Sequence, residues 1–401
     1  MGSHNGDAMD PRTRRYLAGR FRDHYRRTSV SPPPQAHRRE WGYIPWDSRS
    51  GTTMVRHRSL ADLGKINDFL EQAQPQHVYY SAGQYRDPAA ATMAEKDWKG
   101  ADLVFDLDAD HLPGVAPDDP YHEMLSRCKA ELFDLLDMLQ ADFGFTDLDI
   151  IFSGNRGYHV HVRSESVRPL PREARREIAE YIHGESVALE SLVERDLVAG
   201  VGRETPAQVR RLDTERGWGA RIHRELLDRV DHLRSLSTDE AHDVLEDIDG
   251  IGQRRAGAIV EAIDRSYDEI ADGNLDVHPA FLTFVKTVVE DATINQGAAI
   301  DEPVTTDVNR LIRLPGSLHG GSGLVARRIT PETLDIFDPL SHAIPETFRD
   351  HEITVDVPAE TSLELGGRTW SIESGTARVP EYVGVHLMVT ERATKGTESI
   401  R

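Results

Sequence analysis

Residues 104–108, VFDLD, constrain the fold of this chain more than any other segment. The residues before Asp106 are apolar and lack glycine and proline, which predicts a buried strand. Because side chains alternate across a strand, Asp106 and Asp108 share one face and Leu107 lies on the other. Two carboxylates this close repel each other unless a divalent cation lies between them, and such oxygen ligands suit Mg²⁺ or Mn²⁺. The pair therefore predicts a metal site; the alternative is that it only caps the end of a strand.

A glycine-rich turn follows a second apolar strand, at residues 153–157, SGNRG. Its two glycines allow a tight turn whose backbone N–H groups can converge on an anion. Arg156 adds a forked cation for phosphate oxygens. Beyond the turn, His159 and His161 alternate with Tyr and Val residues, so both histidines share one face of a strand, which we expect to be the open one. Together with the carboxylate pair, the turn predicts a site that handles phosphate.

A third block at residues 300–319 reads IDEPVTTDVNRLIRLPGSLH. With DLDAD at 106–110 and SGNRGYH at 153–159, it strongly resembles the small, catalytic subunit of archaeal and eukaryotic DNA primases. The resemblance also takes in REWGY at 39–43, YYS at 79–81 and VPEY at 379–382. Matching segments cover residues 1–180 and 280–395 approximately, in the order of the family.

The resemblance implies a role for each candidate residue. Two metal ions, Mg²⁺ or Mn²⁺, would be held by Asp106, Asp108 and Asp301. The nucleoside triphosphate would be contacted by Ser153, Arg156, His159, Arg313 and His319. The implied chemistry is two-metal nucleotidyl transfer, which needs no protein nucleophile. The implied partners are the primase large subunit, in a heterodimer, and a single-stranded DNA template.

The third block holds two candidate carboxylates, and we predict that Asp301 is the metal ligand. Asp301 follows the apolar residues 298–300, so we expect it to emerge at the end of a core strand. Asp307 precedes Val308 and Asn309, where it can cap a turn or pair with an arginine.

Many members of the family carry a cysteine-rich zinc site after the first motif. In this chain that region offers only His111, His122 and Cys128. Cys128 falls in an apolar helical series, so we predict that its thiol packs in the core and that no zinc is bound.

The chain also lacks a lysine that family members often place after His319 to reach phosphate. Glycines and a serine occupy residues 320–323. Either Arg327 or Arg328 replaces the lysine, or the site works with one cation fewer.

The expected fold class is α/β (α+β), a mixed-sheet primase catalytic domain with an inserted helical subdomain. We place the first part of the catalytic domain at 1–189, the insertion at 190–278 and the second part at 279–401. In the insertion, Ser237 and Glu240 predict a helix-capping box. Residues 244–256 resemble a helix-hairpin-helix turn, which can contact a DNA phosphate; simple helical packing is the alternative.

Charge and composition indicate the environment. The net charge is −21, and lysine makes up only six of the 47 basic residues. Excess carboxylate with little lysine is typical of proteins that work in concentrated salt, which predicts a haloarchaeal origin. A single cysteine excludes an intramolecular disulfide, and neither a membrane-spanning apolar run nor a signal peptide is found. We therefore expect a cytoplasmic protein without a membrane partner.

The sequence thus predicts a primase that synthesises short primers during DNA replication. Two alternatives are a primase-polymerase of DNA repair or end joining and a non-catalytic nucleic-acid-binding module. The match to both ends of the family argues against the first alternative, and the intact carboxylates argue against the second.

Overall fold

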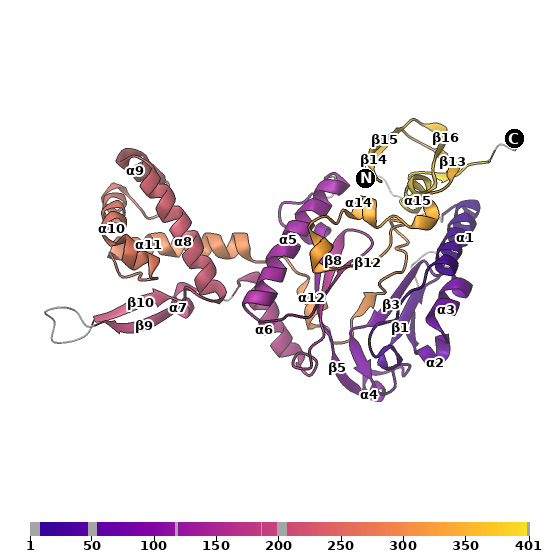
Figure 1. The fold of residues 1–401 in the computed structure, drawn as a ribbon, viewed down its shortest axis with the longest axis horizontal. Helices are drawn as coiled ribbons and strands as arrows, with labels where there is room; N and C mark the ends of the chain where they lie inside the picture. Colours follow the sequence, from indigo (N-terminus) through magenta and orange to yellow (C-terminus); the bar gives the residue numbers. More distant parts are fainter. Residues whose placement is uncertain (1–8, 47–53, 117–118, 186, 199–206, 399–401) are drawn as a thin grey trace, which may run out of the picture. The chain divides into compact units, whose positions relative to one another are not determined.

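The computed structural model describes residues 9–46, 54–116, 119–185, 187–198 and 207–398, and Figure 1 traces its elements. The chain divides into two compact units. The first comprises Met1–Leu132, Asp147–Arg176 and Ala299–Arg401, and the second comprises Phe133–Thr146 and Glu177–Ala298. The predicted insertion at 190–278 lies within the second unit, which also contains residues on both sides of it.

The first unit is built on two four-stranded sheets. One has the order β11-β3-β1-β2, formed by Leu311–Arg313, His77–Ser81, Trp41–Ile44 and Val55–Arg58. The other has the order β12-β7-β8-β6, formed by Arg327–Ile329, Leu148–Phe152, Gly157–Val162 and Leu103–Asp108. The predicted strand before the carboxylate pair is therefore confirmed as β6, whose residues Leu103, Val104, Phe105 and Leu107 are buried.

Smaller sheets complete the first unit. They are β4–β5 (Gly83–Tyr85 and Trp98–Ala101), β16-β13-β17 (Gly375–Pro380, Glu352–Val357 and Thr394–Lys395) and β14–β15 (Thr361–Glu364 and Thr369–Ile372). Every ladder between described strands is antiparallel. Helices and strands alternate along the chain, which confirms the α/β (α+β) class.

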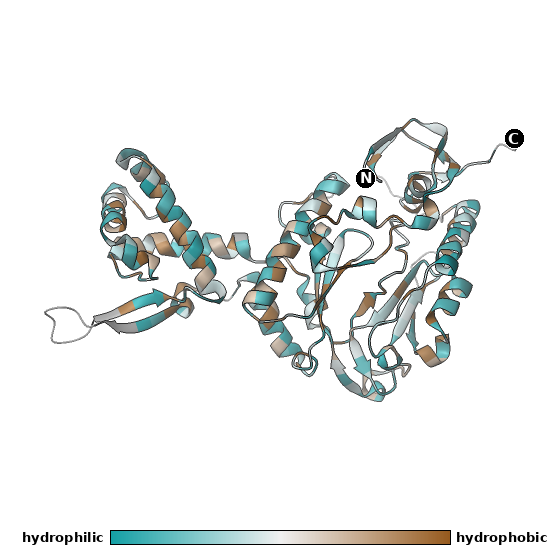
Figure 2. Ribbon diagram, in the orientation of Figure 1, coloured by the Kyte–Doolittle hydropathy of each residue, from teal (hydrophilic) through white to brown (hydrophobic). Residues whose placement is uncertain are grey.

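The first unit also contains helices, most of which are short. They are α1 Pro11–Arg27, α2 Leu60–Leu63, α3 Ile66–Ala73, α4 Met93–Lys96, α12 Glu302–Thr306, α13 Pro331–Leu334, α14 Pro339–His342 and α15 Glu381–Val389, with short 3₁₀ turns at Ala36–Arg38, Ala109–His111 and Glu346–Phe348. Helix α1 buries Leu17, Phe21 and Tyr25 on one side, and Figure 2 shows hydrophilic residues along the rest of it. Helices α5 (Tyr121–Ala141) and α6 (Arg172–His183) begin in the first unit and end in the second.

The second unit is mostly helical. Its elements are α7 Leu189–Leu192, β9 Val193–Val198, β10 Ala207–Leu212, α8 Gly217–Ser235, α9 Thr238–Glu246, α10 Gln253–Ala271 and α11 Pro279–Gln296. The capping box is confirmed at the start of α9, where the Ser237 and Glu240 side chains each bond the other's backbone N–H. The residues between α9 and α10 form a turn with Gly250 in the left-handed region, and DNA contact by this turn stays a prediction. None of the described helices combines the length and apolar character needed to span a bilayer.

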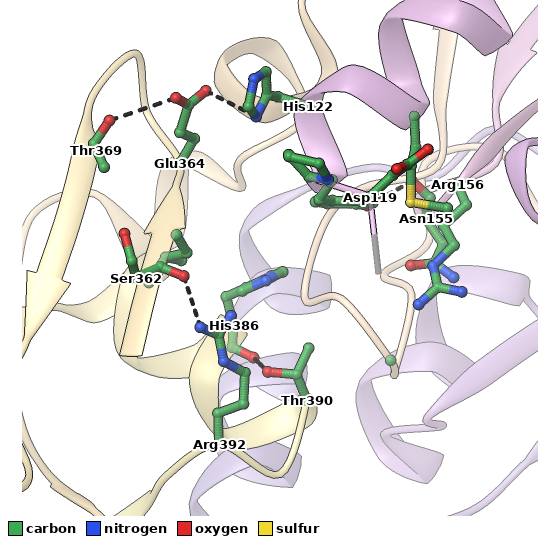
Figure 3. A pocket seen from close by; sticks show the side chains of 15 residues that line it. Asp119, His122, Asn155, Arg156, Ser362, Glu364, Thr369, His386, Thr390 and Arg392 are labelled. Atoms are coloured by element: carbon green, nitrogen blue, oxygen red, sulfur yellow. Dashed lines mark hydrogen bonds and ion pairs between the residues drawn. The ribbon is translucent and has the colours of Figure 1, made fainter. Parts of the chain in front are cut away.

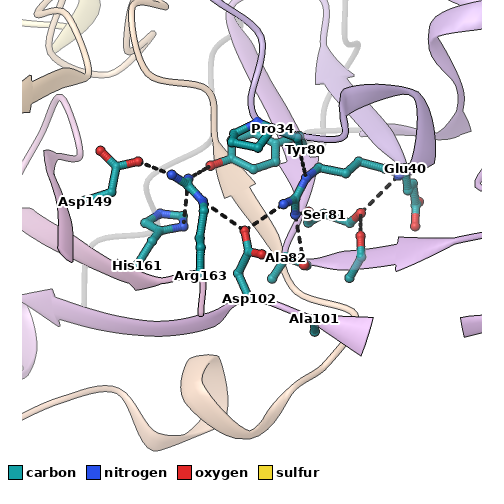
Figure 4. Close-up of polar contacts among 12 residues, drawn as sticks. Pro34, Glu40, Tyr80, Ser81, Ala82, Ala101, Asp102, Asp149, His161 and Arg163 are labelled. Atoms are coloured by element: carbon teal, nitrogen blue, oxygen red, sulfur yellow. Dashed lines mark hydrogen bonds and ion pairs between the residues drawn. The ribbon is translucent and has the colours of Figure 1, made fainter. Parts of the chain in front are cut away.

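A network of buried charges joins the two four-stranded sheets (Figure 4). Arg39, which precedes β1, donates to the Asp102 carboxylate at 2.7 Å, and both side chains are fully buried. Arg163, which follows β8, donates to the same carboxylate at 3.1 Å and to Asp149. Arg39 also donates to the Ser81 carbonyl oxygen, so few of its N–H groups lack a partner. Because breaking one pair would leave a buried charge uncompensated, this network holds the sheets in a defined relation.

Candidate active site

The carboxylate pair lies at the end of β6. Asp106 and Asp108 are half-buried on the same face of the strand. The antiparallel register places Asp106 opposite His159 of β8, with His159 Nε2 3.3 Å from Asp106 Oδ1. Asp108 accepts the backbone N–H of Asp110 at 3.2 Å. Burial raises the pKa of Asp108, and the nearby charges of Asp106 and Asp110 add to this increase.

Asp301 joins this pair through the backbone. Its N–H donates to the carbonyl oxygen of Asp106 at 2.8 Å, and its carboxylate lies 3.9 Å from the Arg310 guanidinium. The prediction that Asp301 ends a core strand is wrong, because residues 298–300 form no ladder and Asp301 begins helix α12 as its N-cap. Asp307 caps the turn after α12, as predicted, by accepting the N–H of Asn309 at 2.9 Å.

The glycine turn connects β7 to β8 in a tight hairpin. Its geometry depends on Ser153, whose hydroxyl accepts the N–H groups of Asn155 at 3.4 Å and Gly157 at 3.3 Å. Gly154 is in the left-handed region with φ +88°, as the sequence predicts for a glycine-dependent turn. At Gly157 a Cβ atom would lie 1.9 Å from the carbonyl oxygen of Leu107, so only glycine lets β8 pair with β6 here.

Arg156 projects from this turn toward the carboxylates. Its Nη1 donates to both oxygens of Asp110, at 2.6 and 2.7 Å, while its carbonyl oxygen accepts the N–H of Ala109 at 3.1 Å. Both side chains are exposed, so an incoming anion could replace Asp110 as the partner of Arg156 at little cost. We did not predict the role of Asp110, although it lies two residues after Asp108 in the same motif.

The buried Arg313 and the half-buried His319 lie together in a cluster with two half-buried residues of β3. Arg313 Nη1 is 2.8 Å from His77 Nδ1, and Nη2 donates to the Tyr79 hydroxyl at 3.0 Å. The His77 and His319 rings are 4.8 Å apart. Burial and the charge of Arg313 lower the pKa of His77 to about 3, and the same causes hold the pKa of His319 well below its usual value. The cluster therefore carries its positive charge on Arg313.

The Arg313 cluster borders the glycine turn. A Cβ atom on Gly154 would lie 3.0 Å from His319 Cβ, and the Ser322 hydroxyl donates to the Gly154 carbonyl oxygen. Sequence reasoning missed His77 and Tyr79 as members of the site. Their alternation on one strand, two residues apart on the same face, is the signal that could have found them.

The expectation that His159 and His161 share an open face is wrong. His159 is 8% exposed and His161 is fully buried. The Tyr80 ring of β3 stacks on His161, with centroids 6.4 Å apart, and Arg163 lies 3.5 Å from His161 Nδ1. The neighbouring sheet covers this face, and only the end of β8 nearest the glycine turn approaches the carboxylates.

Two of the three residues considered as zinc ligands, His122 and Cys128, make other contacts. His122 pairs with Glu364 at 3.4 Å, and Cys128 is buried with its sulfur 3.6 Å from the Leu107 carbonyl oxygen. Burial raises the pKa of the Cys128 thiol, which disfavours the thiolate that a metal needs. Among the described residues, no three His, Cys, Asp or Glu side chains are close enough as they lie to surround a metal ion. The absence of zinc stays a prediction.

Comparison with known proteins agrees with these motifs. The family model described as DNA primase small subunit matches residues 105–331, more than half of the chain, and every candidate site residue lies in that range. The DNA primase small subunit PriS of Haloarcula marismortui is 54% identical over 392 residues, which cover 97% of this chain and 100% of that protein. The chain belongs to the DNA primase small subunit family.

Further small subunits of DNA primase show the same coverage. That of Halobacterium salinarum is 52% identical and that of Methanothrix thermoacetophila 40% identical, each covering 97% of this chain and 100% of the relative. The predicted family and haloarchaeal affinity are therefore confirmed. The full-length match to primase small subunits does not favour a repair primase-polymerase or a non-catalytic module.

Proposed function

We propose that this chain catalyses primer synthesis, joining nucleoside triphosphates on a single-stranded DNA template during replication. The observation that carries the proposal is the position of Asp106. It is bonded through its backbone to Asp301, lies opposite His159, and shares a strand face with Asp108. Residues of two distant motifs are thus joined through their backbones beside a glycine turn that bears a cation.

The donor set suits a hard divalent cation. Asp106, Asp108 and Asp301 offer carboxylate oxygens, which Mg²⁺ and Mn²⁺ prefer. The raised pKa of Asp108 reflects burial and carboxylate repulsion, both of which a bound cation would offset. Metal ions held by these residues would supply electrostatic stabilisation of the attacking and leaving oxygens.

The surrounding cations suit a triphosphate. Arg156 is exposed at the turn and can exchange Asp110 for phosphate oxygens. Arg313, held by His77 and Tyr79, adds a fixed positive charge, and the neutral His319 can contribute a hydrogen bond. The Ser153 hydroxyl shapes the turn, and His159 orients Asp106. Positioning and charge neutralisation of this kind are what phosphoryl transfer requires of a protein.

The proposal includes partners and location. A small subunit implies a larger one, and we assign to this chain a heterodimer with a primase large subunit. The enzyme class is a DNA-directed polymerase of the primase type. A cytoplasmic location agrees with a replication enzyme that has one cysteine.

The test is primer synthesis by Asp106→Asn and Asp108→Asn on single-stranded DNA with nucleoside triphosphates, in Mg²⁺ and in Mn²⁺, with and without the large subunit. We expect no detectable primers from either variant, because the amide is a far weaker cation ligand than the carboxylate. Thermal unfolding should show that both variants fold. Asp68→Asn, at an exposed position on α3, is the matched control and should keep full activity. Near-normal synthesis by either site variant would overturn the metal assignment.

A further inference from the structure

A cavity of about 540 Å³ opens beside the glycine turn (Figure 3). Asn155 and Arg156 of the turn form one wall, and Tyr121 and Met124 of α5 form another. The remaining walls come from the β14–β15 hairpin and from the end of α15. Its volume is within the range of pockets that hold small organic ligands, and it combines apolar with convergent polar groups.

Arg392, just after α15, is an arginine of this cavity whose hydrogen bonds go to uncharged groups. Its Nη2 donates to the Thr361 hydroxyl and, at 2.7 Å, to the Ser362 carbonyl oxygen, which leaves Nη1 and Nε available. Among the described residues no carboxylate pairs with it. Burial lowers the pKa of Arg392, and no neighbouring negative charge offsets that effect. A half-buried guanidinium without a counter-charge is costly, and an anion in the cavity would relieve that cost.

The acidic residues of the cavity already have partners. Glu364 pairs with His122 at 3.4 Å, and Asp119 lies 3.5 Å from Arg127 and accepts the N–H of Ala116 at 3.0 Å. Neither carboxylate contacts the positive charge of Arg392, whose side chain lies beside Ser362 (Figure 3). Burial and this charge both lower the pKa of the neighbouring His386, which therefore stays neutral.

The two arginines suggested by the sequence as extra phosphate ligands are engaged elsewhere. Arg327 donates to the His342 carbonyl oxygen at 2.7 Å, and Arg328 pairs with Asp149 at 2.6 Å. Neither lines the cavity, whereas Arg392 shares it with Arg156 and Gly321. The arginines that line the cavity are thus Arg156 and Arg392.

We propose that this cavity binds the phosphate groups of a nucleotide, held between Arg156 and Arg392. The inference rests on the proposed function, because it extends the phosphate site of the glycine turn. A nucleotide fits better than an inorganic ion, since the cavity is large and the apolar surfaces of Met124 and Leu363 suit an organic group. The phosphates belong either to the tail of the reacting nucleoside triphosphate or to a second nucleotide.

The test is equilibrium dialysis of the full chain with ATP and with AMP in Mg²⁺. Arg392→Gln should weaken ATP binding about tenfold or more, because charge-assisted bonds to phosphate are lost, and should leave AMP binding nearly unchanged. Arg392→Lys should keep most of the ATP affinity. If the unaltered chain binds one ATP and Arg392→Gln binds one ATP more weakly, the phosphates in the cavity belong to the tail of the reacting nucleotide. If the unaltered chain binds two ATP molecules and Arg392→Gln binds one, they belong to a second nucleotide.

Thr361→Val separates binding from structure, because it removes a hairpin contact of Arg392 but keeps the guanidinium. It should bind ATP like the unaltered chain. Unchanged ATP binding by Arg392→Gln, or an equal loss in Thr361→Val, would overturn the inference. If one of these results is obtained while the unaltered chain binds ATP and makes primers, the proposed function stands and only the role of this cavity is overturned. If the unaltered chain binds no ATP, both the proposed function and the inference about the cavity are overturned.

Discussion

Asp106 receives the backbone N–H of Asp301 and lies opposite His159, so single residues from three separated motifs meet at one position of β6. Each contact uses a different group of Asp106: the carbonyl oxygen, the strand backbone and the carboxylate. The backbone contacts fix the place of Asp106, while its carboxylate faces His159 and is the group that would bind a cation. Arg156 and Asp110 show the opposite arrangement, in which an exposed ion pair occupies side chains that a ligand could separate.

The two carboxylates of the third motif should differ in their effects. Asp301→Asn should abolish primer synthesis as completely as Asp106→Asn, because the backbone bond from Asp301 to Asp106 places Asp301 beside the carboxylate pair. Asp307→Asn should retain most activity and lower the free energy of unfolding by about 1 kcal/mol, the size of a lost cap. Primer assays and chemical unfolding of both variants measure this difference. An inactive Asp307→Asn beside an active Asp301→Asn would show that the metal ligand is Asp307.

At the scale of elements, the site depends on close approach between β6 and β8. The hairpin β7–β8 brings the glycine turn beside the end of β6, and the Ser153 hydroxyl closes that turn. Helix α1 supports the site from another direction, since the Tyr25 hydroxyl accepts the N–H of Leu318, next to His319. The catalytic side chains are therefore positioned by elements that are themselves packed, as a precise site requires.

Two glycine substitutions should have opposite effects on stability. Gly157→Ala should lower the free energy of unfolding by about 3 kcal/mol or more, because its Cβ would overlap the Leu107 carbonyl oxygen. Gly19→Ala, in the middle of α1 with no atom within 4 Å of the new Cβ, should raise it by about 0.5–1 kcal/mol. Denaturant unfolding of both variants provides the measurement. Equal stability of Gly157→Ala and the unaltered chain would mean that β8 does not approach β6 this closely.

At the scale of the whole molecule, the net charge of −21 opposes folding through self-repulsion. The positive residues are used locally: Arg39, Arg163 and Arg175 are committed to buried bonds, and Arg156 and Arg392 to the candidate site. Excess carboxylate thus remains on the surface, where salt screens it.

Stability should therefore depend on ionic strength. We expect the melting temperature to rise as KCl increases from low to molar concentration, because the Debye length falls from about 10 Å at 0.1 M to about 3 Å at 1 M. Thermal unfolding across a KCl series measures the effect. Sucrose of matched osmolality is the control and should reproduce only a small part of the increase. A melting temperature that does not change with KCl would show that surface repulsion is unimportant here.

Local features of the chain could be predicted because they depend on neighbours in sequence. Strand alternation placed Asp106 and Asp108 on one face, and apolar periodicity placed Cys128 on a buried helix face. The capping box at Ser237 follows from residues three apart. The three motifs in order also sufficed to indicate the family.

The remaining features depend on contacts between residues far apart in the chain. His77 meets Arg313 across 236 residues, and the stacking of Tyr80 on His161 closes a face that alternation alone leaves open. Asp301 is placed by a single bond to Asp106 and not by a strand of its own. Arg392 faces the same cavity as Arg156 only because α15 ends beside the glycine turn. Periodicity reports which face of an element is apolar, whereas packing between elements decides what covers that face, and only the tertiary structure contains that information.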